Sequence, residues 1–129
     1  MIPTERDKRF LTLARRIALR SSFFKKQVGV AIVKGNKDLA EGWNRLSHPT
    51  YLQFPGIDEL RYFSLHAEVD ALARANDVRH ATAYLFGFKK GRLGYAAPCG
   101  LCRRYLKLRG IKRIVYTGIQ GKSIHEEKL

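Results

Sequence analysis

Two short stretches decide the fold of this chain: HAEVDALARA at residues 66–75 and PCGLCRRYLKL at residues 98–108. Both are predicted to be helices. Each carries metal-binding side chains in its first turn, His66 in the first stretch and Cys99 and Cys102 in the second. Side chains three apart in a helix lie on one side, so both sulfurs can face one point. We therefore expect the two helices to aim their amino ends at a shared metal site.

His66, Cys99 and Cys102 make up one of the accepted ligand sets of a catalytic zinc ion. Such a site takes three protein ligands and leaves the fourth position to water, whereas a structural site normally needs a fourth Cys or His. The chain has no other cysteine, and its other histidines lie in unpatterned or turn-like contexts: His48, His80 and His125. The sequence therefore predicts a catalytic Zn²⁺ site.

Glu68 lies two residues after His66 and can reach a water molecule on the metal. Because two thiolates cancel the formal charge of Zn²⁺, that water is acidified less than at an all-histidine site, and a nearby base becomes useful. Alone, a C-x-x-C is also typical of a structural zinc half-site or a redox pair, and an H-x-E carries little information. Together, the two motifs favour a catalytic site with Glu68 as the proton shuttle.

The rest of the chain alternates between helical and extended patterns, which predicts an α/β fold. Apolar residues recur at three- and four-residue intervals within residues 4–21, as in an amphipathic helix capped by Thr4. The other expected elements are strands at 27–33 and 38–44, a loop at 45–65, a strand at 81–88, a basic turn or strand extension at 89–95, helix 99–109, a strand at 111–117 and a polar tail at 118–129.

Length and composition predict one soluble domain, residues 1–129. No apolar run is long enough to cross a bilayer, and the amino terminus lacks the apolar stretch of a secretory signal, so a cytoplasmic protein is expected. The chain has 25 basic and 11 acidic side chains, a formal net charge of +14. This charge favours anionic partners such as phosphates or nucleic acid.

Most of the chain, residues 20–117, resembles the cytidine and deoxycytidylate deaminase superfamily. RSSFFKKQVGVAIVKGNKDLAEGWN at residues 20–44 is similar to the opening of deoxycytidylate deaminases, and its end, EGWNR, is also similar to a stretch of tRNA adenosine deaminases. SLHAEVDAL and AAPCGLCRRYLKLRGIKRIVYTG look most like small deoxycytidylate deaminase-like proteins of bacteriophages and bacteria. The H-x-E and P-C-x-x-C signature is that of zinc nucleobase deaminases.

The resemblance implies a three-layer α/β/α cytidine deaminase-like fold with a mixed central sheet of four to five strands. It also implies hydrolytic deamination of a nucleobase, with Asn44 as a substrate contact and a homo-oligomeric assembly. For a phage-encoded protein, the expected compartment is the host cytoplasm. Two departures stand out: Tyr95-Ala96-Ala97 replaces the family's usual threonine-containing run, and the short tail predicts that the fifth strand and final helix are absent or shortened.

Three functions remain open from the sequence. The first, favoured by the resemblance, is deamination of a free cytosine nucleotide such as dCMP to dUMP. The second is deamination of cytosine or adenine within single-stranded DNA or RNA, and the third is a non-enzymatic, zinc-stabilised nucleic-acid-binding module. A nucleotide phosphate needs one or two basic groups, for which the candidates are Arg20, Lys25, Lys26 and Arg45. A polymer needs stacking aromatics as well, for which the candidates are Phe23, Phe24, Tyr51, Phe54, Tyr62 and Phe63.

Overall fold

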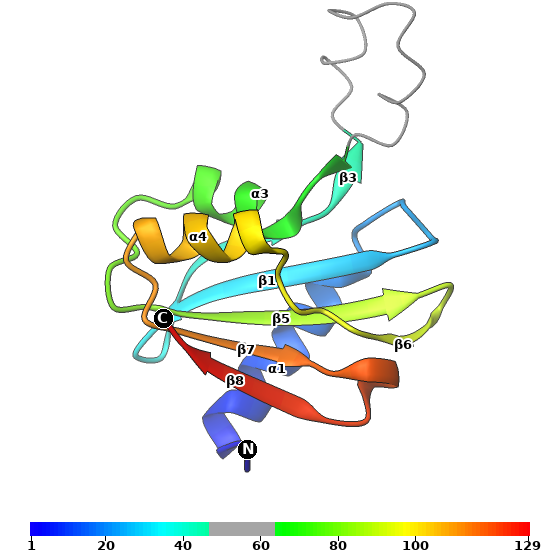
Figure 1. Ribbon diagram of the computed structural model, residues 1–129, viewed down its shortest axis with the longest axis horizontal. Coiled ribbons are helices and arrows are strands. Elements are labelled where there is room, and N and C mark those ends of the chain that lie inside the picture. The colour runs from blue at the N-terminus through cyan, green and yellow to red at the C-terminus, as the bar shows by residue number, and fades with distance from the viewer. Residues whose placement is uncertain (47–63) are drawn as a thin grey trace, which may run out of the picture.

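A mixed β-sheet with helices on both faces forms the body of the protein (Figure 1). The structure is a computed structural model and describes residues 1–46 and 64–129. In these residues the main sheet follows the order β2-β1-β5-β7-β8, and β6 pairs with β5 off this path. Among the strand pairs that the structure describes, β5–β7 is the parallel one and the others are antiparallel. The elements are α1 (Glu5–Ala18), β1 (Gln27–Lys34), β2 (Lys37–Trp43), β3 (Arg45–Leu46), β4 (Ser64–Leu65), α3 (Ala67–Arg74), β5 (Thr82–Lys89), β6 (Arg92–Gly94), α4 (Gly100–Leu108), β7 (Arg113–Thr117) and β8 (Ile124–Lys128).

Helix α1 covers one face of the sheet. It begins at Thr4 with a capping box, in which the Thr4 hydroxyl accepts from the Asp7 amide and the Asp7 carboxylate accepts from the Thr4 amide, both at 3.1 Å. Its buried side chains pack on residues that point to this face from three strands: Ala31, Val33, Tyr84 and Val115. Gly29 of β1 permits this close approach, because a Cβ there would lie 2.2 Å from the Ala14 carbonyl oxygen.

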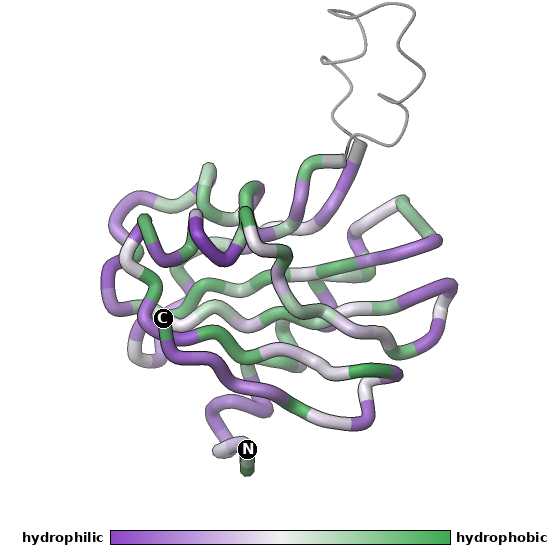
Figure 2. The backbone as a smooth tube through the Cα atoms, in the orientation of Figure 1, coloured by the Kyte–Doolittle hydropathy of each residue, from purple (hydrophilic) through white to green (hydrophobic). Residues whose placement is uncertain are grey.

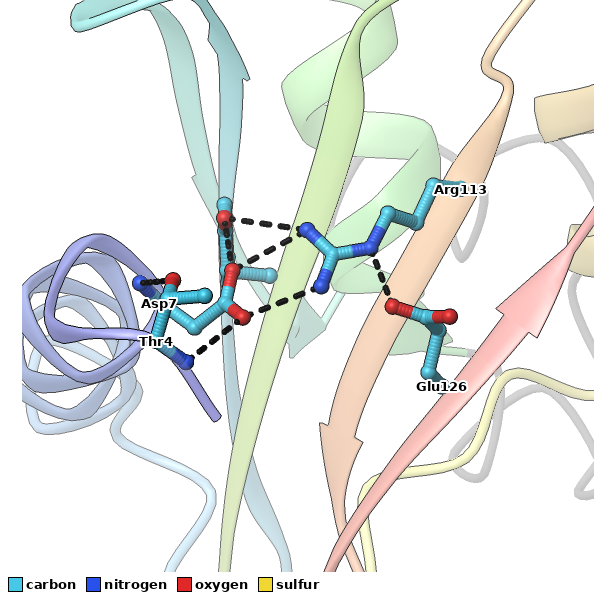
Figure 3. Close-up of polar contacts among 5 residues, drawn as sticks. Thr4, Asp7, Arg113 and Glu126 are labelled. Carbon is cyan, nitrogen blue, oxygen red and sulfur yellow. Dashed lines mark hydrogen bonds and ion pairs between the residues drawn. The ribbon is translucent and has the colours of Figure 1, made fainter. Parts of the chain in front are cut away.

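An ion-pair network centred on the buried Asp7 carboxylate joins α1 to β7 and β8 (Figure 3). The Asp7 carboxylate accepts hydrogen bonds from Nη1 and Nη2 of Arg113, each at 3.0 Å, and from the Tyr84 hydroxyl at 2.7 Å. Nε of Arg113 donates to Glu126 of β8. Burial would raise the pKa of Asp7, but the hydrogen bonds from Arg113 and Tyr84 outweigh it and hold the pKa well below its usual range.

Helices α3 and α4 cover the opposite face, side by side in Figure 1. The alternate residues of the same strands, such as Val30, Ile32, Leu85 and Ile114, form a second buried cluster there. Helix α3 sits close on β2 because Gly42 has no side chain, and a Cβ there would lie 2.3 Å from the Ala71 nitrogen. The two buried clusters confirm the predicted three-layer α/β/α arrangement.

The carboxyl-terminal segment differs from the expectation of an absent or shortened last strand. Strand β8 pairs antiparallel with β7 along its length, from Thr117–Ile124 to Arg113–Lys128, and supplies a fifth strand to the main path. Figure 2 shows that β8 is mostly hydrophilic, unlike the inner strands, and for that reason its sequence carries no strand-like apolar alternation. The predicted strand extension near residue 90 is the short hairpin β5–β6.

The segment expected to be a loop, residues 45–65, has paired ends. Arg45 and Leu46 form β3, which pairs antiparallel with Ser64 and Leu65 of β4, so the two ends of this stretch lie side by side. The candidate stacking residues Tyr51, Phe54, Tyr62 and Phe63, together with His48, lie outside the described residues. Of the helices that the structure describes, none has the length and apolar character to cross a membrane.

Candidate active site

A cavity of about 320 Å³ opens where the amino ends of α3 and α4 meet the start of β1. This volume is within the range of small-molecule sites. Four of the five predicted site residues line the cavity: Asn44, His66, Glu68 and Cys99. The other lining residues are Lys26, Val28, Ala67, Tyr95, Ala96, Ala97, Pro98 and Arg103. The fifth, Cys102, lies behind the wall and is buried.

The three predicted metal ligands come together, with their ligand atoms all within 4.8 Å of one another. Nδ1 of His66 lies 3.2 Å from Sγ of Cys102 and 3.9 Å from Sγ of Cys99. Tetrahedral zinc with ordinary bond lengths would hold a nitrogen and a sulfur about 3.6 Å apart, between these two values. The donor set and its spacing therefore fit a zinc ion.

Both helices present their amino ends to this cluster, as predicted. His66 is the N-cap of α3, and Cys99 is the N-cap of α4, where its Sγ accepts from the Cys102 amide at 3.4 Å. Burial raises the pKa of the Cys102 thiol well above its usual range, and the neighbouring Glu68 carboxylate raises it further. A bound divalent cation, helped by the two positive helix ends, would offset both effects and hold Cys102 as a thiolate.

Glu68 occupies the first turn of α3 and is only 5% exposed, yet it lines the cavity. A buried carboxylate on a cavity wall can exchange protons with whatever fills the cavity. A carboxylate in this position can serve as a general base toward a molecule bound in the cavity.

Asn44 is buried in the cavity wall, but part of its amide is already engaged. Its Oδ1 accepts from the Val28 amide at 2.8 Å, and its Nδ2 donates to the Lys26 carbonyl at 2.7 Å. One amide hydrogen and one lone pair remain for another partner. Asn44 therefore fixes the start of β1 and still presents polar atoms to the cavity.

Of the basic candidates for phosphate binding, only Lys26 lies in this cavity. Arg20 pairs with Glu41 at 3.0 Å, and Arg45 pairs with Asp70; both guanidinium groups stack on the Trp43 ring. Phe24 is 63% exposed near the β5–β6 hairpin, and Phe23 is half-buried.

Arg103 and Tyr95 are cavity residues that sequence reasoning did not place there. Arg103 lies on α4 and contributes to the cavity lining. Arg109, at the end of the same helix, donates to the carbonyls of Leu72, Ala75 and Asn76 at the end of α3. Arg103 could have been predicted to lie near the site from its sequence position, because it follows Cys102 directly and lies one helical turn after the N-cap Cys99.

The chain belongs to the family described as "Cytidine and deoxycytidylate deaminase zinc-binding region", which matches residues 4–118. Its fold is similar to that of dCMP deaminase from the cyanophage S-TIM5 in apo form, with a TM-score of 0.68 at 21% identity over 91% of this chain and 86% of that one. The same enzyme in complex with dCMP and dUMP gives a TM-score of 0.64 at 18% identity, covering 92% and 85% of the two chains.

A cytidine deaminase from Burkholderia pseudomallei is also similar, with a TM-score of 0.66 at 18% identity over 94% of this chain and 91% of that one. No curated protein sequence matches this chain. Family membership and the His66, Cys99 and Cys102 cluster support an enzyme of the deaminase class that uses zinc and acts on cytidine-type substrates.

Proposed function

We propose that this protein deaminates the cytosine base of a free nucleotide, converting dCMP to dUMP. The observation that carries the proposal is the convergence of His66, Cys99 and Cys102 beside Glu68 at one cavity. Three ligands with a buried carboxylate form the arrangement needed for hydrolysis at a metal, in which water replaces ammonia on the ring.

The chain's own residues have distinct parts in the reaction. His66, Cys99 and Cys102 would hold zinc, which when bound would supply an acidified water molecule. The Glu68 carboxylate accepts one proton from the attacking water and delivers it to the ring nitrogen beside the amino-bearing carbon. It then carries a second proton to the departing amino group, so that water and cytosine give uracil and ammonia. The free half of the Asn44 amide contacts the substrate beside β1.

A free nucleotide is the preferred substrate for two reasons. The cavity has the volume of a small-molecule site, and the similar S-TIM5 enzyme is described in complex with dCMP and dUMP. A polymer substrate would need a stacking track, and most of the candidate aromatics lie outside the described residues. A purely structural zinc module leaves unexplained why Glu68 is buried against the cavity.

A deamination screen tests the proposal. Purified protein is assayed for ammonia release from CMP, dCMP, cytidine, deoxycytidine, single-stranded DNA and RNA, with Glu68→Gln as the control. We expect dCMP to be among the substrates and Glu68→Gln to lower kcat by about 10²–10⁴-fold while zinc content stays at that of the wild type. Unchanged turnover in Glu68→Gln would contradict the mechanism.

Size-exclusion chromatography with light scattering on the same samples tests the expected homo-oligomer. Turnover of oligonucleotides but not of dCMP would favour the polymer function instead.

A further inference from the structure

Arg103 stands between the catalytic cavity and a second hollow. The second hollow, about 420 Å³, lies between α4 and the end of β8 and is lined by Gly100, Arg103, Arg104, Lys107, Glu127 and Lys128, with Leu129 at its end. Arg103 belongs to the lining of both. The lining has four basic side chains and one acidic side chain, Glu127, so the second hollow favours anionic groups that extend from the catalytic cavity.

The Arg103 guanidinium is held in one orientation. Its Nε and Nη2 donate to the two Glu127 carboxylate oxygens at 2.7 and 2.9 Å, and the Tyr116 hydroxyl donates to the same carboxylate at 3.1 Å. Within the described residues, Nη1 makes no hydrogen bond. A guanidinium fixed along one edge presents its other donors without the entropy cost of ordering a free side chain.

Lys26 adds a second cation to the cavity. The Lys26 carbonyl oxygen accepts from the Asn44 Nδ2 at 2.7 Å, and the Lys26 amide donates to the Phe23 carbonyl at 3.1 Å. These two hydrogen bonds fix the backbone of Lys26. Lys26 is exposed and Arg103 is half-buried, whereas Glu68 is only 5% exposed. The two cations, Lys26 and Arg103, therefore lie nearer to solvent than the buried Glu68 carboxylate.

We propose that Arg103, oriented by Glu127, binds the phosphate of the substrate nucleotide and makes this enzyme prefer a nucleotide over the corresponding nucleoside. The inference rests on the proposed deaminase function and adds the residue that selects the substrate. With the base directed at the zinc cluster, the phosphate extends toward the solvent side, where Arg103 and Lys26 lie. A phosphate ester carries one to two negative charges at neutral pH and accepts from paired guanidinium donors.

The test compares Arg103→Gln with Arg104→Gln, its neighbour on α4. Arg104 lines the second hollow but not the catalytic cavity, so it controls for a general loss of charge. The measured quantity is kcat/KM for dCMP divided by kcat/KM for deoxycytidine, which does not depend on the fraction of folded enzyme. We expect Arg103→Gln to lower this ratio about 10–100-fold, the value of one charge-assisted contact, and Arg104→Gln to leave it within about twofold.

Glu127→Gln provides a second variant that keeps the guanidinium but frees it. We expect it to raise KM for dCMP with little change for deoxycytidine. An unchanged ratio in Arg103→Gln, or an equal fall in Arg104→Gln, overturns the inference while leaving the deaminase function standing. A preference seen for a deoxycytidine-containing oligonucleotide but not for dCMP overturns the assignment to a mononucleotide.

A binding measurement separates this inference from the proposed function. Calorimetric titration of dCMP and of deoxycytidine into Glu68→Gln, with and without Arg103→Gln, needs no turnover. Tighter binding of dCMP that is lost with Arg103→Gln supports the inference even if the screen finds no deamination. Equal binding of the two ligands, or no binding of either, overturns it.

Discussion

Asp7 and Glu68 are both buried carboxylates in the first turn of a helix, but they lie on opposite faces of the sheet. Asp7 is 2% exposed and accepts four hydrogen bonds, from the amide of Thr4, the hydroxyl of Tyr84 and two nitrogens of Arg113. Glu68 is 5% exposed and lines a cavity next to the metal cluster. A carboxylate whose acceptors are saturated stabilises the fold, whereas one that borders a cavity remains available for proton transfer.

The largest effect is expected at the metal cluster beside Glu68, where Cys102→Ser replaces a proposed metal ligand. We expect loss of bound zinc and a fall in deaminase activity of at least about 10³-fold, because a hydroxyl does not replace the thiolate that completes the catalytic set. Zinc is measured by atomic emission and activity by ammonia release. Arg104→Gln, on the same helix and outside the metal cluster, is the control. Full zinc content in Cys102→Ser would remove this residue from the ligand set.

On the Asp7 side the expected effect is on stability alone. Asp7→Asn leaves Arg113 without one of its two carboxylate partners, and we expect a loss of about 3 kcal/mol in the free energy of unfolding. Chemical denaturation gives this value, and activity per folded molecule should stay at that of the wild type. A large fall in the activity of fully folded Asp7→Asn would contradict a purely stabilising role for Asp7.

The same variant makes a pH prediction with a definite sign. Because the pKa of Asp7 is lowered in the folded protein, its stabilisation is fully present above the unfolded pKa of about 3.9 and is lost as the pH falls toward the folded value. The stability difference between wild type and Asp7→Asn should therefore shrink as the pH is lowered from about 5 to 3. If the stability difference between wild type and Asp7→Asn stayed constant over this range, the stabilisation by Asp7 would not depend on its charge.

Gly29 and Gly42 allow the two faces of the sheet to be compared directly, because a helix packs equally closely on each of them. An added Cβ would lie 2.2 Å from the α1 backbone at Gly29 and 2.3 Å from the α3 backbone at Gly42. We expect Gly29→Ala and Gly42→Ala each to cost about 2 kcal/mol of stability through overpacking. Only Gly42→Ala should also weaken zinc binding and activity, since α3 carries His66 and Glu68. A zinc competition assay with a chromogenic chelator measures the difference.

The smallest effect is expected at Asp70, which braces the cavity wall from behind. It accepts from the Trp43 amide at 3.1 Å and pairs with Arg45 and Arg74. Because both arginines are more than a third exposed, Asp70→Asn should cost only about 1 kcal/mol. It should also raise KM for dCMP a few-fold by loosening Asn44, which follows Trp43. An unaltered KM would show that Asn44 is held by its contacts with β1 alone.

Local pattern was enough to predict most of the fold and the metal cluster. The capping residue Thr4, the β-branched run of β1 and the two motif helices each carry their signal within a few residues. The meeting of His66 with Cys99 and Cys102 was predictable because their types and spacings have a chemical reason to converge.

Pairings between distant side chains that belong to no shared motif were not predictable. Nothing near Arg103 in sequence indicates that Glu127 will orient it, and nothing near Asp7 indicates Arg113. Strand β8 is polar, and it becomes a strand because β7 offers it an edge. The burial of Asp7 could not be predicted either, because it depends on which strands lie next to α1. The local pattern of apolar residues does not give the order of strands in the sheet.

The Asp7–Arg113 pair also constrains when the protein can finish folding. The partners are 106 residues apart, so α1 leaves the ribosome long before the strand that fastens it exists. At ordinary synthesis rates this delay is roughly 5–20 s. During that time the apolar face of α1 lacks Val115 of β7, and the buried Asp7 carboxylate lacks the Arg113 cation. Final docking of the first helix therefore belongs among the last steps of folding, which makes the nascent chain most exposed to aggregation or chaperone capture before β7 is made.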